Sequence, residues 1–412
     1  MHPRNAKPSF RELTKLYGKK CCSVHVCSTK KRAQQSPKLL SKPQKPLGTT
    51  RKTKMKTLTS KLIGLSAAVL LSVTPSFGQT TATTDPVGFI TLNIAGGSPS
   101  AVTFLGLSMT RPIDYQGFAD TVAGAVITSA NATWTDNQFA STPLPGYFLE
   151  VSTGAKAGLL TQVVSCNDAA NTITVADDLQ AMGVGNGVSF KLRKNWSLAS
   201  LFGSANEAGL GGGTAASGDL IAIYDPTLGG GAGGYNQYFY STGGLPGVGW
   251  RKVGGGSANQ ADTAIWLDDG LVVTRKQVAN LAVVVTGAVK LGQTISPVLA
   301  GPNFIGNVYP SGSLTLGNSN LYTGSNATGV VPGTAATADL ILIYDQTLGG
   351  GAGGYNQYFY SSGGLPGIGW RKVGGGSADQ AGVSLDSGKS IVLKRNSGGP
   401  FSWTIPQPFP NP

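Results

Sequence analysis

The sequence predicts an all-β protein with two homologous antiparallel β-sandwich or barrel-like domains and a small β-unit inserted in the first. The first observation is a duplication: the 42 residues Asp219–Gln260 recur at Asp339–Gln380 with five differences. Short apolar runs bounded by glycine and proline predict strands within each copy. Glycine supplies 60 of the 412 residues, and apolar positions in the copies do not recur at helical spacing over ten or more residues.

The chain begins with a basic segment, residues 1–54, which we expect to be disordered. Residues 1–78 hold 17 Lys and Arg and a single acid, whereas the remaining 334 hold 15 bases and 18 acids. The simplest interpretation is that translation starts at Met55. A nucleic-acid-binding arm, a metal site at Cys22, His25 and Cys27, and an organelle transit peptide are the alternatives. The high isoelectric point therefore does not predict a nucleic-acid partner.

Residues 55–78 have the pattern of an export signal. Lys56 and Lys61 precede the uncharged apolar run Leu62–Val73, and small residues precede a cleavage point before Gln79. The run has 12 residues, short of the roughly 20 that span a bilayer. We expect a secreted protein, periplasmic or extracellular, with no stable membrane span after the signal is removed. An uncleaved tethering helix is the alternative.

The duplication sets the expected domain boundaries, with a first β-domain over residues 79–276, a second over 277–396 and a C-terminal tail over 397–412. Ser197 is expected to cap a short helix that ends at Phe202. In the first copy the expected strands are Leu220–Tyr224, Tyr235–Tyr240, Trp250–Val253 and Leu271–Arg275.

The first domain carries about 78 residues that the second lacks, if Pro112 and Pro310 correspond. This insertion covers about residues 113–190. Its strands are expected at Tyr147–Val151, Leu159–Ser165, Thr172–Val175 and Gly187–Leu192.

Three motifs resemble those of a family of uncharacterised exported bacterial proteins. They are the DPVGF opening at Asp85–Phe89, the KNWSL segment at Lys194–Leu198, and the repeated glycine-rich and GWRKVG blocks. The resemblance covers most of residues 79–396. It implies export and repeated architecture, and it brings no activity, substrate or site residues.

Catalytic and metal chemistry is weakly represented after residue 78. That part of the chain has no histidine and one cysteine, Cys166, which is more typical of a packing residue than of a nucleophile. The glycine tracts Gly229–Gly234 and Gly349–Gly354 lack the lysine and the helix of a phosphate loop and predict hairpin connections. No calcium-loop signature surrounds the turn aspartates. We expect no enzyme, no cofactor and no metal.

Carboxylates leave one enzymatic alternative, a polysaccharide hydrolase. The only glutamates after residue 78, Glu150 and Glu207, are not shared by the copies. Asp219 and Asp225 are shared, as Asp339 and Asp345, but the members of each pair are expected at opposite ends of one strand. The hydrolase therefore ranks third among the expected functions.

The surface most suggestive of function combines aromatic rings with polar groups. Flat rings beside amide and guanidinium groups match sugar rings, although alternation must send one face of each strand into the core. We expect a non-enzymatic structural or binding protein, with a lectin-like protein as the alternative. A glycan, a cell-surface component or a second copy is the expected partner. The candidate ligand-binding residues are Tyr238, Tyr240, Trp250, Arg251, Tyr358, Tyr360, Trp370 and Arg371.

Overall fold

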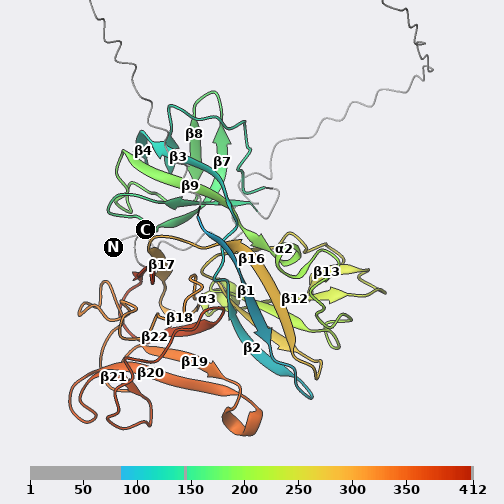
Figure 1. Cartoon of the computed structure of the whole chain (residues 1–412), viewed down its shortest axis with the longest axis vertical. Helices are drawn as coiled ribbons and strands as arrows, with labels where there is room; N and C mark the ends of the chain where they lie inside the picture. The colour runs from blue at the N-terminus through green and yellow to red at the C-terminus, as the bar shows by residue number, and fades with distance from the viewer. Residues whose placement is uncertain (1–84, 143–145, 410–412) are drawn as a thin grey trace, which may run out of the picture. The chain divides into compact units, whose positions relative to one another are not determined.

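The computed structural model describes residues 85–142 and 146–409, and nearly all of their regular structure is β-strand (Figure 1). The all-β prediction is confirmed. The basic segment and the expected export signal lie outside the described residues. None of the helices in the described part of the chain has the length and apolar character to cross a bilayer.

The first copy of the duplication forms a five-stranded antiparallel sheet in the order β13-β12-β11-β15-β2. Each predicted strand is present within one residue at either end. Ile221 lies opposite Tyr238 in the central pair. The bounds are β2 Ala101–Gly106, β11 Leu220–Asp225, β12 Gly234–Ser241, β13 Gly249–Lys252 and β15 Gly270–Arg275.

The second copy forms a sheet with the corresponding order, β18-β22-β19-β20-β21. Ile341 lies opposite Tyr358, which is the same register as in the first copy. The two segments of near-identical sequence therefore make the same hairpins. The bounds are β18 Gly301–Gly306, β19 Leu340–Asp345, β20 Gly354–Ser362, β21 Ile368–Lys372 and β22 Ser390–Arg395.

A two-stranded ribbon accompanies each sheet, and these ribbons shift the expected boundaries. The strand β16, Leu281–Ala288, pairs with β1, Val87–Ile94, although it was expected to open the second domain. The expected tail contains the strand β23, Phe401–Ile405, which pairs with β17, Thr294–Val298. Alternate residues of β23 are buried because they fill the second core, and the indole N–H of Trp403 donates to the carbonyl of Ser319 at 2.7 Å.

The segment expected as an insertion forms a separate seven-stranded sheet with its own apolar core, at the top of Figure 1. Its order is β3-β9-β6-β7-β8-β5-β4. The four strands predicted there are β6 to β9, and three further strands precede them. The bounds are β3 Ile113–Ala119, β4 Thr121–Ala123, β5 Val126–Thr128, β6 Tyr147–Val151, β7 Leu160–Asn167, β8 Thr172–Val175 and β9 Val188–Lys194.

Short elements complete the described chain. The predicted helix is α2, Leu198–Phe202, and the hydroxyl of its N-cap Ser197 accepts from the backbone N–H of Ser200. Ser197 also ends the short strand β10, Trp196–Ser197, which pairs with β14, Ala264–Ile265. The glycine tracts contain single turns, α3 Leu228–Gly231 and η1 Leu348–Gly351, and they connect adjacent strands as predicted.

The two sheets meet at a seam made by three aromatic side chains from each. The ring of Phe104 stacks on Tyr344 with centroids 4.8 Å apart, and Phe304 stacks reciprocally on Tyr224 at 4.9 Å. Such pairs stabilise a contact by about 0.5–1.5 kcal/mol beyond the area they bury. The remaining members, Tyr235 and Tyr355, contact the seam edge-on.

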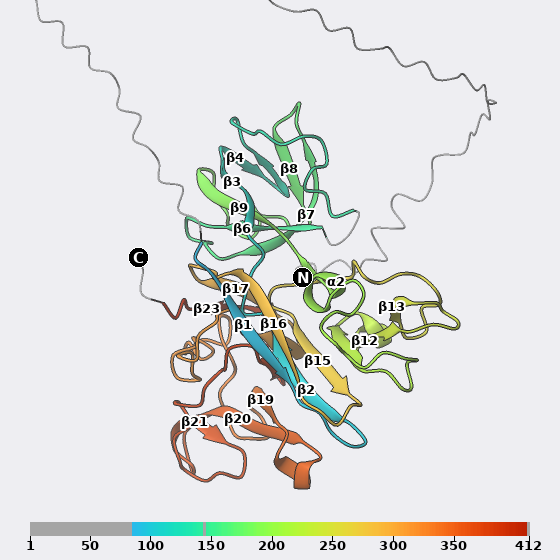
Figure 2. The same ribbon diagram turned by 45° about the vertical axis from the view of Figure 1, so that its right-hand side comes forward.

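Backbone contacts at the seam are also reciprocal. The N–H of Gly106 donates to the carbonyl of Gly388 at 3.0 Å, and the equivalent N–H of Gly306 donates to that of Asp268 at 3.0 Å. A Cβ on Gly106 would lie 2.4 Å from the carbonyl oxygen of Lys389, so no side chain fits there. The repeats are therefore related by an approximate two-fold axis, and β13 and β21 are the edge strands farthest from it in the sheet order (Figures 1 and 2).

Candidate functional site

Most of the predicted ligand-binding aromatics lie in the two cores. Trp250 and Trp370 retain 1% and 4% of their surface, and each contacts the tyrosine beside it, Tyr240 or Tyr360, edge-on. The indole N–H of Trp250 donates to the carbonyl of Gly203 at 2.8 Å. Neither tryptophan presents a flat face to solvent. This burial contradicts the expectation that they form a sugar-binding surface, because the strand face they occupy is the one that fills the core.

The other predicted rings are also packed. Tyr238 and Tyr358 are buried, whereas Tyr240 and Tyr360 are half-buried. Burial is the main cause that raises the pKa of Tyr238 above its ordinary value. The duplicated aromatic residues thus pack in the core beneath each sheet.

Arg251 and Arg371 have a different role, because each braces the loop that precedes it. In the first repeat the Arg251 guanidinium donates to the carbonyls of Pro246 at 3.2 Å, Val248 at 2.7 Å and Trp250 at 3.0 Å. Arg371 makes the same three bonds, at 3.1, 2.7 and 2.9 Å. Charge-assisted bonds of this kind are stronger than neutral ones, so the loop backbone is held in one conformation.

We call residues 243–249 and 363–369 the braced loops. Each exposes two aliphatic side chains. Leu245 and Leu365 are fully exposed, and Val248 and Ile368 are 62% and 68% exposed. Large apolar groups in solvent at the tip of an ordered loop are costly to hydrate and are typical of contact surfaces. Sequence reasoning missed these residues, although identical leucines in two glycine–proline loops are a signal visible in the repeat.

A shallow hollow lies beside the first braced loop. It is open to solvent, has a volume of about 440 Å³ and is lined by Phe239, Leu245, Pro246, Lys252 and Val253 together with small residues. Apolar side chains make up most of its named lining, and one cation stands at its edge. Leu245 and Pro246 of the braced loop are part of the lining, so the loop and the hollow form one surface.

The first pair of shared carboxylates, Asp219 and Asp339, stabilises the fold through buried ion pairs. Asp219 is 2% exposed and accepts from the Arg275 guanidinium at 2.8 Å and from the backbone N–H groups of Gly211 and Lys276, both at 2.7 Å. Asp339 makes the equivalent pair with Arg395 at 3.1 Å. Each carboxylate fastens the start of one strand to the end of its neighbour, which leaves it without a free oxygen for catalysis.

The second shared pair lies at turns. Asp345 is partly exposed, and hydrogen bonds from the hydroxyl and backbone N–H of Thr347 lower its pKa. Asp225 accepts the same two bonds from Thr227, and each aspartate also accepts from an asparagine on the next strand. The turn interpretation of these aspartates agrees with the geometry.

A buried ion network joins the inserted sheet to the rest of the described chain. Glu150 accepts from Lys290 Nζ at 2.7 Å and from Arg193 Nε at 3.5 Å. Arg193 also pairs with Asp85, the first residue of the DPVGF motif. The Nζ atom of Lys191 lies 3.1 Å from the same carboxylate. Burial lowers the pKa of Lys290, and the charge of Glu150 opposes that shift. Asp85 of the DPVGF motif and Glu150 thus link the inserted sheet to the rest of the described chain through buried ion pairs.

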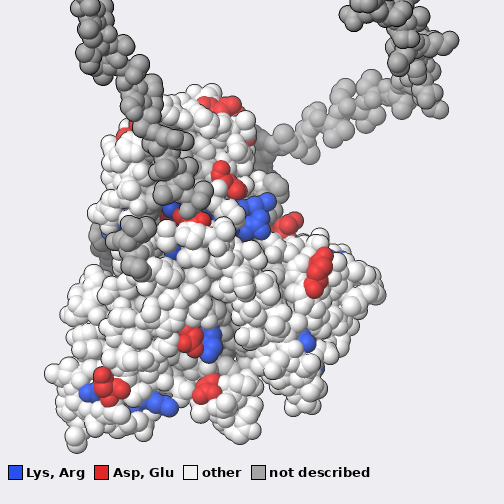
Figure 3. Space-filling model, in the orientation of Figure 1, with Lys and Arg blue, Asp and Glu red and all other residues white. Residues whose placement is uncertain are grey.

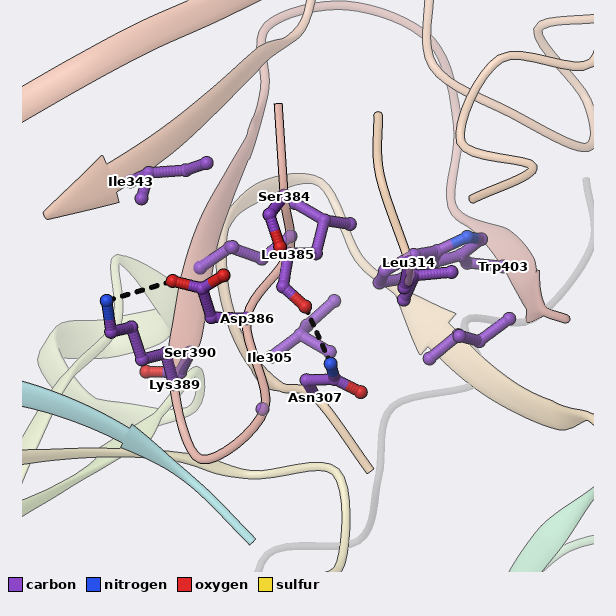
Figure 4. A pocket seen from close by; sticks show the side chains of 13 residues that line it. Ile305, Asn307, Leu314, Ile343, Ser384, Leu385, Asp386, Lys389, Ser390 and Trp403 are labelled. Carbon is purple, nitrogen blue, oxygen red and sulfur yellow. Dashed lines mark hydrogen bonds and ion pairs between the residues drawn. The ribbon is translucent and has the colours of Figure 1, made fainter. Parts of the chain in front are cut away.

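A narrow, partly open pocket in the second repeat is too small for a substrate. It holds about 30 Å³, which is room for a water molecule. Figure 4 shows Asp386 paired with Lys389 and Asn307 bonded to the Leu385 carbonyl at its wall. Cys166 lies elsewhere, buried in the inserted core, where its thiol donates to the Thr135 carbonyl at 3.4 Å.

Metal-type side chains do not gather in threes anywhere in residues 85–142 and 146–409. No protein-family model, curated protein or solved structure matches this chain. The resemblance drawn from the sequence motifs stays a prediction.

Proposed function

We propose that this chain is an exported, non-enzymatic structural and binding protein that makes its contacts through the two braced loops. The observation that carries the proposal is the pair of fully exposed leucines, Leu245 and Leu365, each at the tip of a loop held by three arginine bonds. A loop with no partner gains nothing from rigid display of an aliphatic tip. Two equivalent sites on one chain also raise avidity for a repeated or extended partner.

The engaged carboxylates support a non-enzymatic role, because Asp219 and Asp339 are buried in ion pairs. Export is supported by the sequence of residues 55–78 alone. N-terminal sequencing of the native protein is the test of export, and we expect Gln79 as the first residue. An intact basic leader on protein from the cell interior would overturn the exported role.

Fractionation of producing cells tests the loops. We expect the protein in the cell-surface fraction, and we expect Leu245→Ser with Leu365→Ser to move it into the medium. The matched control replaces two exposed valines outside the loops, Val278→Ser with Val284→Ser, and keeps the wild-type distribution. Surface retention that is unchanged in the leucine variant would refute a role for the loops.

A further inference from the structure

We propose that the open edge of β1 pairs with β1 of a second copy of this chain, which joins two copies into a closed dimer. The two strands run antiparallel, so the β1–β16 ribbons of both copies form one continuous sheet. This contact does not include the braced loops and goes beyond the proposed function. It follows from the direction of the hydrogen bonds along β1, from the exposure of its side chains, and from the contrast with the equivalent strand of the second repeat.

The outer edge of β1 carries main-chain groups that no other strand engages. Ala288 of β16 exchanges two hydrogen bonds with Thr110, at 2.8 and 2.9 Å, so its N–H and C=O point away from β1. Val87 lies opposite Ala288 and therefore points its own N–H and C=O away from β16. Every second residue after Val87 has the same direction, and none of these groups has a partner within residues 85–142 and 146–409. The four edge residues are Val87, Phe89, Thr91 and Asn93.

The side chains along this edge are uncovered as well. Val87 and Phe89 are 79% and 70% exposed, although cross-strand neighbours about 5 Å away would cover much of that surface. Natural proteins protect edge strands from pairing by charged residues, proline or a bulge. β1 contains no charged residue and no proline, and its register with β16 is regular. It is therefore an unprotected template for another strand.

The second repeat shows the same edge occupied. The strand β17 precedes β18 as β1 precedes β2, and it pairs with the strand after β22 as β1 pairs with the strand after β15. In β17 the N–H of Ile295 donates to the carbonyl of Gly158 at 2.9 Å, and Ile295 is 8% exposed. Pro297 lies on the same edge two residues later and has no N–H to offer. The fold thus covers this edge in the second repeat and leaves it open in the first.

The geometry of β1 suits pairing with its own copy. If the two-fold axis passes beside Ile90, the four edge residues of one strand face those of the other. They then exchange about eight hydrogen bonds, two for each facing pair. Phe89 comes to lie opposite Thr91 of the second copy, and an aromatic residue opposite a β-branched one is a favourable cross-strand pair. Because both copies use the same surface, the contact is closed and assembly stops at the dimer.

Charge favours an identical partner over a charged one. Neither β1 nor β16 contains a charged residue, so no like charges meet when two copies of this ribbon pair. Figure 3, in the orientation of Figure 1, shows few charged side chains over these two strands. A strongly charged partner would find no opposite charge there. The chain after residue 78 has 15 bases and 18 acids, so overall repulsion between copies is weak.

Sedimentation velocity of the purified exported protein over a range of concentrations tests the proposal. We expect a reversible monomer–dimer equilibrium and no larger species. Phe89→Lys should weaken the dimer about 100-fold or more, because two aromatic pairs are lost and two cations come close to the axis. Val284→Lys is the matched control. Val284 is 61% exposed on the same face of the ribbon but belongs to β16, so this variant should dimerise like wild type. Near-ultraviolet circular dichroism confirms that each variant is folded.

The main-chain contact has its own test. Amide hydrogen exchange at residue resolution should slow at Phe89 and Thr91 as the concentration rises, whereas Ile90 faces β16 and should be protected in monomer and dimer alike. Thr91→Pro removes one outward N–H and no hydrogen bond to β16, as Pro297 does in β17. We expect this variant to remain folded and monomeric.

Three results would overturn the inference. They are a wild-type monomer at every concentration, a dimer that persists in both Phe89→Lys and Thr91→Pro, and a dimer whose edge amides exchange as fast as those of the monomer. The braced loops are tested separately, because Leu245→Ser with Leu365→Ser should form the same dimer as wild type. Loss of the dimer in that variant would assign the contact to the loops and also overturn the inference.

Discussion

Replacing Asp219 by alanine should destabilise the protein severely. The carboxylate is buried and accepts from the Arg275 guanidinium and from two backbone N–H groups, all at 2.7–2.8 Å. Removing one member of a buried ion pair costs about 3–5 kcal/mol because the other charge stays in the interior. We expect a loss of that size in the free energy of unfolding, measured by urea titration with tryptophan fluorescence.

Two controls separate this cause from a general effect of losing an aspartate. Asp225→Ala removes a partly exposed turn carboxylate from the same strand and should cost less than about 1 kcal/mol. Adding Arg275→Met to Asp219→Ala removes the stranded charge and should recover part of the loss. A cost below about 1 kcal/mol for Asp219→Ala, or a double variant no more stable than the single, would refute the reasoning.

Three further predictions concern the core, the seam and the tyrosines. Trp250→Ala should cost about 3–5 kcal/mol in urea titration, since it empties the first core; an unchanged midpoint would contradict that burial. Gly106→Ala should lower the melting temperature by overpacking the seam, at about 1–3 kcal/mol, while Gly312→Ala, with open space around it, should not. Burial, aided by the Asp114 carboxylate, raises the pKa of Tyr147 from 10.0 to about 12. Its contribution to stability is complete below pH 10 and is lost as the pH rises toward 12. In an absorbance titration the Tyr147 phenolate should form only as the pH approaches 12. Titration of every tyrosine near pH 10 would contradict this assignment.

The strands of the repeats could be predicted because their signals are local. Tyr235–Tyr240 and Leu271–Arg275 are apolar or aromatic runs between glycine tracts, and pleat and turn chemistry place them whatever the rest of the chain does. The cap at Ser197 was predictable for the same reason. The expected tail was wrong because Phe401–Ile405 is a strand only beside β17, a partner about a hundred residues earlier.

In the candidate site, too, the sequence identified residues by local signals, whereas their packing depended on the fold. Duplication made Trp250 and Arg251 conspicuous, but alternation along a strand cannot say which face meets a core. In the folded chain the tryptophan lies in the core and the arginine donates to the loop carbonyls. Leu245 lies in the same loop and is exposed to solvent.

Composition and periodicity alone determined that this chain is built from strands, that one block occurs twice, and that the part after residue 78 has no imidazole for catalysis. Only the tertiary structure decided that the repeats face each other across a seam and present their loops at opposite edges. The reason is physical: backbone preference acts over a few residues, whereas burial and charge pairing depend on groups that folding brings together from distant parts of the chain.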